Sequence, residues 1–194
     1  MSRLEYTYSP AMSFADQLTV ARIAATPFVL ALFVWHFPNH DYYATVLFAL
    51  AMTTDWFDGR VARSSGHSSA LGSLLDPIAD KVLVLSTLIV LVQFKIFPGW
   101  LVALIVAREF LVSGLRLAAL ERGVVMQARD LGKLKTWSQA IAVGLGGLQA
   151  GGAWSSVDIA LWAGVVALVL TWLSGLDYAR VAPQILRGSK SLPR

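Results

Sequence analysis

The sequence predicts an all-α, polytopic membrane protein with six transmembrane helices and a short interfacial helix ahead of the first. Of its 194 residues, 56% are hydrophobic and only 14% are charged, whereas a soluble domain carries about 25% charged residues. Apolar stretches of about 20 residues, long enough to cross the bilayer core, recur along the chain. We find no repeat or linker, so residues 1–194 are expected to form a single membrane domain.

The six expected spans are separated by residues that stop helices. Proline, glycine or paired serines follow the first, second, third and fifth spans, at Phe37-Pro38-Asn39, Ser64-Ser65-Gly66, Phe97-Pro98-Gly99 and Gly151-Gly152. The spans run over about 18–37, 42–63, 70–94, 100–120, 134–150 and 157–178. Phe14 and its neighbours are expected to form the short helix at the membrane interface.

Lysine and arginine are distributed unevenly among the connections. Lys95 is the single basic residue in the first, third and fifth connections, against twelve at the termini and around the second and fourth: Arg3, Arg60, Arg63, Arg116, Arg122, Arg129, Lys133, Lys135, Arg180, Arg187, Lys190 and Arg194. By the positive-inside rule, both termini and the second and fourth connections face the cytoplasm. The net charge of +4 therefore indicates topology and anionic ligands, not nucleic acid.

Composition excludes several other classes of site. The chain has no cysteine, which excludes disulfides, iron–sulfur clusters and cysteine–zinc sites. Its three histidines lack the helical spacing of metal ligands and are expected in loops or interfaces. The first fifteen residues contain Glu5 and no basic start before an apolar run, so a cleaved signal peptide is not expected.

Four aspartates stand within one 26-residue stretch of this apolar chain. Asp55 and Asp58 lie at the end of the second span, and Asp76 and Asp80 at the start of the third, so each pair shares one helical face. Carboxylates in membrane segments are costly and mark functional sites. Because hard divalent cations prefer oxygen ligands and relieve the repulsion between carboxylates, we expect a metal site at the cytoplasmic end.

Basic residues are expected at the same level as the aspartates: Arg60, Arg63, Lys81, Arg108, Arg116, Lys133 and Lys135. Carboxylate-bound metal surrounded by guanidinium and ammonium groups is suited to phosphate. Gly59 and Gly72 would let a nucleotide approach closely, although tight helix packing explains either glycine equally well. Glu109 is expected to orient the neighbouring Arg108.

The spacing D-x2-D-G-x2-A-R-x8-G-x3-D-x3-D is complete in this chain, on Asp55, Asp58, Gly59, Ala62, Arg63, Gly72, Asp76 and Asp80. In this pattern the chain resembles the CDP-alcohol phosphatidyltransferase family, over about residues 14–180. Segments 17–27, 107–116 and 132–139 resemble its bacterial phosphatidylglycerophosphate synthases. One departure is Ala15-Asp16, where those synthases usually have Pro-Asn.

The resemblance implies a role for each matching residue. Asp55, Asp58, Asp76 and Asp80 would hold one or two Mg²⁺ or Mn²⁺ ions, and Asp80 would also be the general base. The nucleotide of CDP-diacylglycerol would be bordered by Gly59, Arg63 and Gly72. The phosphate of glycerol 3-phosphate would be bound by Arg108, Arg116, Lys133 and Lys135.

The resemblance also implies a reaction and a setting. The phosphatidyl group of CDP-diacylglycerol would pass to glycerol 3-phosphate, giving phosphatidylglycerol phosphate and CMP. The enzyme would be a homodimer among the lipids of the bacterial inner (plasma) membrane, with no nucleic-acid partner. Alternatives are a family member using inositol phosphate, serine or phosphatidylglycerol as acceptor, an inactive homologue, and a small cation transporter. A transporter leaves the surrounding basic residues unexplained, because they would repel its ion.

Overall fold

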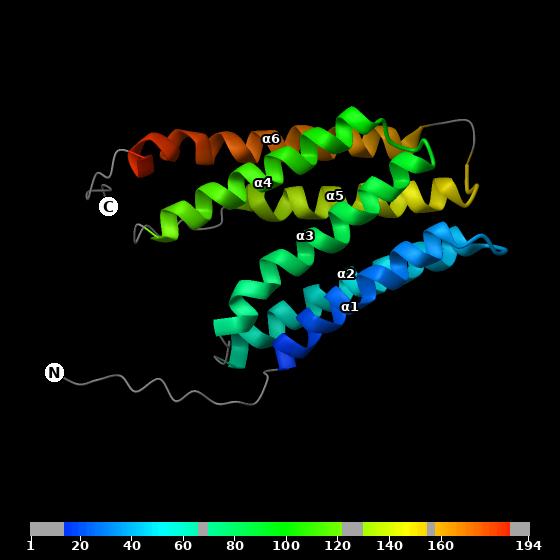
Figure 1. Cartoon of the computed structure of the whole chain (residues 1–194), viewed down its shortest axis with the longest axis horizontal. Coiled ribbons are helices and arrows are strands. Elements are labelled where there is room, and N and C mark those ends of the chain that lie inside the picture. The colour runs from blue at the N-terminus through cyan, green and yellow to red at the C-terminus, as the bar shows by residue number, and fades with distance from the viewer. Residues whose placement is uncertain (1–13, 66–69, 122–129, 155–157, 187–194) are drawn as a thin grey trace.

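The computed structural model of the chain describes residues 14–65, 70–121, 130–154 and 158–186. Within them it contains six α-helices and no strand, which confirms the expected all-α class (Figure 1). The helices are α1 (Phe14–Val34), α2 (His40–Ser65), α3 (Ala70–Gln93), α4 (Gly99–Glu121), α5 (Asp130–Ala150) and α6 (Ile159–Leu186).

Three helix boundaries differ from those expected from the apolar stretches. Phe14 is the first residue of α1, so the separate interfacial helix expected there is wrong for the described residues. Nothing between Phe14 and the apolar stretch stops a helix, and Asp16 suits the positive end of the helix dipole. Helix α5 begins at Asp130 and α6 continues to Leu186. Hydropathy marks the apolar part of a helix, whereas backbone hydrogen bonding continues into polar residues beyond it.

The helices alternate in direction, so their ends gather at two poles of the molecule. Figure 1 shows α1, α3 and α5 beginning at the pole where α2, α4 and α6 end. At the opposite pole the chain reverses with left-handed backbone at Asn39 (φ 62°), Lys95 (φ 59°) and Gly152 (φ 84°). The segments with the four aspartates and with Arg60, Arg63, Arg116, Lys133 and Lys135 therefore lie towards the first pole.

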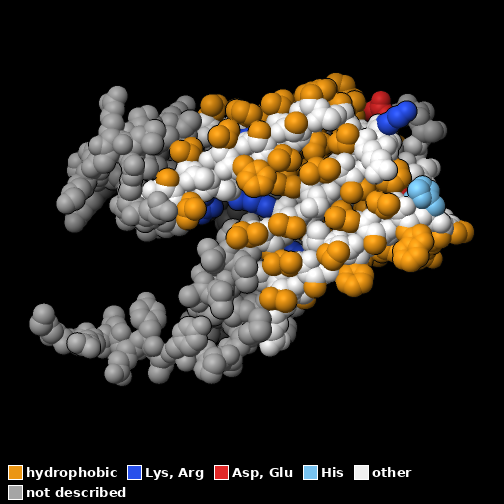
Figure 2. Space-filling view, in the orientation of Figure 1, with side chains coloured by type: hydrophobic (Ala, Val, Ile, Leu, Met, Phe, Trp, Pro, Cys, Tyr) orange, Lys and Arg blue, Asp and Glu red, His pale blue; other side chains and the backbone are white. Residues whose placement is uncertain are grey.

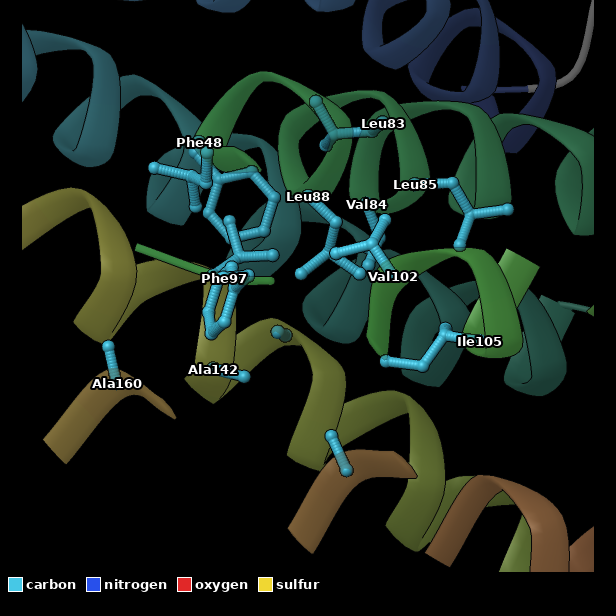
Figure 3. Packing of buried hydrophobic residues seen from close by; sticks show 14 of the residues in the cluster. Phe48, Leu83, Val84, Leu85, Leu88, Phe97, Val102, Ile105, Ala142 and Ala160 are labelled. Atoms are coloured by element: carbon cyan, nitrogen blue, oxygen red, sulfur yellow. The ribbon is translucent and has the colours of Figure 1, made fainter. Parts of the chain in front are cut away.

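Phe97 packs where α2 and α3 meet α5 and α6. It lies in the connection between α3 and α4, is 1% exposed, and packs in the core with Phe48 of α2 and Leu88 of α3 (Figure 3). A Cβ atom on Gly146 of α5 or Gly164 of α6 would come within 3.0 Å or 2.8 Å of the Phe97 ring. These glycines make room for the ring between α5 and α6. Such close approach at small residues is the means by which helices associate in lipid.

Apolar side chains cover much of the face of the molecule seen in Figure 2. Large exposed examples occur on every helix, among them Phe28, Val46, Ile89, Phe110, Ile141 and Trp162. One described helical segment, Ile159–Leu176 in α6, is long and apolar enough to cross a membrane, with a mean hydropathy of 2.1. Thr19–Val34 and Lys81–Gln93 are shorter apolar segments. The other five crossings stay predictions, because charged residues interrupt or shorten the apolar part of several of these helices.

We expect Gly147→Ala to destabilise the bundle and Gly144→Ala to leave it unchanged or slightly more stable. A Cβ at Gly147 would lie 2.1 Å from Thr45 Oγ1, where α5 crosses α2, whereas nothing lies within 4 Å of one at Gly144. Overpacking costs about 1–3 kcal/mol, against a gain of up to about 1 kcal/mol from replacing a helical glycine. The midpoint of thermal unfolding in detergent measures the stability of both variants. Equal midpoints would contradict the close approach of α2 to α5 at Gly147.

Candidate active site

The aspartate motif is carried by the end of α2 and the beginning of α3, two consecutive helices. Asp55, Asp58, Gly59 and Arg63 belong to the last turns of α2, and Gly72, Asp76 and Asp80 to the first half of α3. The helical backbone confirms that each aspartate pair has face-sharing spacing. The side chains themselves lie outside the described residues, so their metal and nucleotide contacts stay predictions. Among the described side chains, no group of three histidines or acids could hold a metal.

A cluster of buried and partly buried polar side chains joins α4, α5 and α6 near the middle of these helices. We call it the Glu109 cluster, and its members are Arg108, Glu109, Lys135, Gln139, Thr171 and Ser174. Glu109 is 3% exposed and Arg108 2%. Charges so deeply buried are tolerated only when they are paired and hydrogen-bonded, and the cluster provides partners for Glu109 and for both terminal nitrogens of Arg108, while Arg108 Nε has none among the described residues.

One carboxylate oxygen of Glu109 receives three donors. Its Oε1 accepts from Arg108 Nη1 at 2.9 Å and from Gln139 Nε2 at 3.3 Å. It also accepts from Lys135 Nζ, which forms an ion pair with it across α4 and α5. The expectation that Glu109 orients Arg108 is confirmed, and Lys135 proves to be its second cationic partner.

The guanidinium of Arg108 is held at both ends. Its second terminal nitrogen, Nη2, donates to Ser174 Oγ of α6 at 2.5 Å, and Ser174 Oγ donates onward to the Thr171 carbonyl at 3.0 Å. Gly175 leaves room for the group, because a Cβ there would lie 3.0 Å from Arg108 Nε. Arg108 is therefore built into the helix packing.

A second polar contact links this cluster to α3. Lys81 Nζ donates to Ser113 Oγ, and Ser113 Oγ donates to the backbone carbonyl of Glu109 at 2.6 Å. These three residues line one part of a groove of about 300 Å³ between α3 and α4, whose remaining wall is mostly apolar: Ile78, Val82, Leu85, Ser86, Ile89, Val106 and Phe110. In Figure 2, lysine and arginine side chains come to the surface in the hollow between α3 and the helices above it.

The structure brings together only part of the predicted acceptor site. Arg108 and Lys135 meet through Glu109. Arg116 is exposed on α4, and no described contact joins it to the cluster. Lys133 lies in the first turn of α5, with its side chain outside the described residues.

Sequence reasoning missed the support that α6 gives to the site. Gln139 Nε2 donates to Thr171 Oγ1 at 2.8 Å, and Ser174 accepts from Arg108. Thr171 and Ser174 are fully or almost fully buried, at 0% and 3% exposed. Two hydroxyl residues three positions apart in an apolar helix were the available signal, since polar groups in such helices seek partners on their neighbours.

Comparison with known proteins shows the family to which this chain belongs. A sequence model of the CDP-alcohol phosphatidyltransferase family matches residues 12–173, and the chain belongs to that family of membrane-embedded enzymes. It is 41% identical to the CDP-diacylglycerol–glycerol-3-phosphate 3-phosphatidyltransferase of Bacillus subtilis, over 84% of this chain and 91% of that protein. It is 39% identical to a probable phosphatidylglycerophosphate synthase of Mycobacterium tuberculosis, over 91% and 84% of the two chains. A Cereibacter sphaeroides protein has the same name as the Bacillus protein. It is 32% identical to this chain, over 92% of this chain and 99% of that protein.

We expect Ser174→Ala to destabilise the protein more than Ser138→Ala. The first change leaves a buried guanidinium N–H without its acceptor, which costs about 1–3 kcal/mol. The second removes a hydroxyl that only donates to the Lys135 carbonyl of its own helix, at 2.7 Å, and should cost within about 0.5 kcal/mol. Thermal midpoints of the two variants give the comparison, and a larger loss in Ser138→Ala would contradict the role of Ser174.

Proposed function

We propose that this chain transfers the phosphatidyl group of CDP-diacylglycerol to glycerol 3-phosphate, releasing CMP and leaving phosphatidylglycerol phosphate in the membrane. The observation that carries the proposal is the Glu109 cluster, which holds Lys135 and is linked through Ser113 to Lys81 of α3, the residue after Asp80. An acceptor with a phosphate group needs such cations, whereas an uncharged acceptor does not. Relatives that bear the name of this reaction match most of the chain.

Divalent metal fits the ends of α2 and α3. Asp55 and Asp58 are three residues apart in α2, and Asp76 and Asp80 are four apart in α3, a spacing that supports a shared helical face for each pair. Asp58 lies seven residues before the end of α2 and Asp76 six residues after the start of α3, so the two pairs lie at similar depths in helices of opposite direction. Their carboxylates are the oxygen ligands that Mg²⁺ or Mn²⁺ requires. Bound metal would stabilise charge on the phosphoryl oxygens and on the departing CMP.

The remaining motif residues would bind the nucleotide and move the proton. Gly59 and Gly72 let the cytidine nucleotide approach the helices, and Arg63 contacts its phosphates. The acceptor hydroxyl oxygen attacks the phosphorus that carries the diacylglycerol. A new P–O bond forms to glycerol 3-phosphate as the P–O bond to CMP breaks, and the hydroxyl proton passes to the Asp80 carboxylate.

The basic residues would divide into contact and support. Lys135, with its side chain 14% exposed, and the exposed Arg116 are suited to contact the acceptor phosphate, together with Lys133. Arg108 is held by Glu109 and Ser174, so it would act at the back of this site. The charged groups are pre-positioned, which is how an enzyme stabilises phosphate without reorganising around it.

The proposed setting is the bacterial inner membrane, crossed six times with both termini in the cytoplasm. The helices contain 21 to 28 residues, so they are about 31–42 Å long and can cross a hydrocarbon core of about 30 Å. Most charged residues of these helices lie in the halves nearer one pole, as a cytoplasmic active site requires, whereas Asp41 lies at the other. We also propose the homodimer that the family resemblance implies.

Purified protein supplied with CDP-diacylglycerol and Mg²⁺ should release CMP when glycerol 3-phosphate is added. Serine, inositol phosphate and phosphatidylglycerol should not replace it, and EDTA should stop turnover until Mg²⁺ or Mn²⁺ is restored. CMP release with serine but not with glycerol 3-phosphate would reject the acceptor. Cation flux into liposomes without nucleotide turnover would favour a transporter instead.

Asp80→Asn should lower kcat about 10²–10⁴-fold, because the amide cannot accept the hydroxyl proton. Mn²⁺ binding, measured by calorimetry, should partly survive because three aspartates remain. Asp158→Asn is the matched control, since Asp158 lies in the α5–α6 connection beside Gln149, at the opposite pole. Full activity in Asp80→Asn would remove Asp80 from the role of base.

A further inference from the structure

Glu109 is an acidic residue at the centre of a site proposed to bind an anion. Its side chain is 3% exposed, and the same oxygen pairs with both Arg108 and Lys135. A carboxylate exposed in such a site would repel phosphate, whereas this one is covered by its donors. Its contacts therefore indicate a role in holding the cations, not in touching the substrate.

The position of Glu109 is itself determined by α5 and α6. Gln139 has two amide hydrogens on Nε2, one available to Glu109 Oε1 and one to Thr171 Oγ1. Arg108 is attached on its other side to Ser174 of α6. Because these bonds run between helices, Glu109 cannot move without breaking contacts on both neighbours.

The two cations held by Glu109 differ in their access to solvent. The Arg108 side chain is 3% exposed and that of Lys135 is 14% exposed. A lysine ammonium stands on a flexible four-carbon stem, so it needs an external group to hold it in one place. Glu109 supplies that group, and Lys135 is the member of the pair that an incoming anion can reach.

We propose, on the basis of the proposed function, that Glu109 is a positioning residue for the acceptor phosphate. It holds the Lys135 ammonium at the acceptor site and keeps Arg108 behind it as a fixed part of the helix packing. Glu109 thereby contributes to the preference for an acceptor that carries a phosphate monoester. The CDP-diacylglycerol side of the site does not depend on it.

The test is steady-state kinetics of Glu109→Gln, which keeps the size of the side chain and one acceptor oxygen but removes the charge. The KM for glycerol 3-phosphate should rise about tenfold or more, because a buried charge partner is lost. The KM for CDP-diacylglycerol and kcat should each change by less than about threefold. Asp158→Asn neutralises an acid beside Gln149, which lies about 20 Å from Lys135 along α5. This control should change none of these values.

A double-mutant cycle separates positioning from general structural damage. If Glu109 acts through Lys135, adding Glu109→Gln to Lys135→Met should raise the KM for glycerol 3-phosphate by less than about twofold further. If the KM increases of the two single variants multiply in the double variant, the proposal is overturned. It is also overturned if Glu109→Gln alone leaves the KM for glycerol 3-phosphate unchanged.

A second variant decides the question if Glu109→Gln cannot be purified in folded form. Gln139→Met leaves the charge pair intact but removes the two hydrogen bonds that Gln139 donates, to Glu109 and to Thr171, so the KM for glycerol 3-phosphate should rise about threefold. No rise in that variant would overturn the proposal. Failure of the proposed function would look different, because the unmodified protein would then release no CMP with glycerol 3-phosphate.

Discussion

The pairing of buried charges on Glu109 is the interaction on which the described part of the site depends. In a bundle whose outer surface is largely apolar, an arginine and a carboxylate can be buried only if each finds opposite charge and hydrogen bonds. Glu109, Arg108 and Lys135 meet this condition together, with Gln139 and Ser174. The same contacts that organise the cations therefore also fix how α4, α5 and α6 are placed relative to one another.

Close helix packing supplies the second constraint, at the opposite pole. Phe97 enters between α5 and α6 where Gly146 and Gly164 leave space, and Gly147 lets α2 approach α5. Polar pairing and small-residue packing are the two forces that associate helices in lipid. Polar pairing predominates around Glu109 and small-residue packing around Phe97, so the bundle can bury charge at one level while apolar packing holds it together at another.

The division between contact and support changes how the basic residues are understood. Arg108 and Lys135 are alike in charge, but the first is enclosed by Ser174, Gly175 and Glu109, and the second reaches a more open position. An acidic residue beside them does not weaken an anion site when its oxygen is covered by donors. It reduces the freedom of the cations, which would otherwise have to be ordered when substrate binds.

The sequence by itself determined the six helices, the family and the residues of the aspartate motif, because apolar length, helix-stopping residues and motif spacing are local properties. It also predicted the pairing of adjacent Arg108 and Glu109. Only the tertiary structure decided that Lys135, Gln139 and Ser174 complete the cluster, and that α1 is continuous from Phe14. Ser174 lies 66 residues from Arg108, and contacts at that separation depend on how each helix is rotated against its neighbours. That rotation is set by the packing of the whole bundle, so no local pattern specifies it.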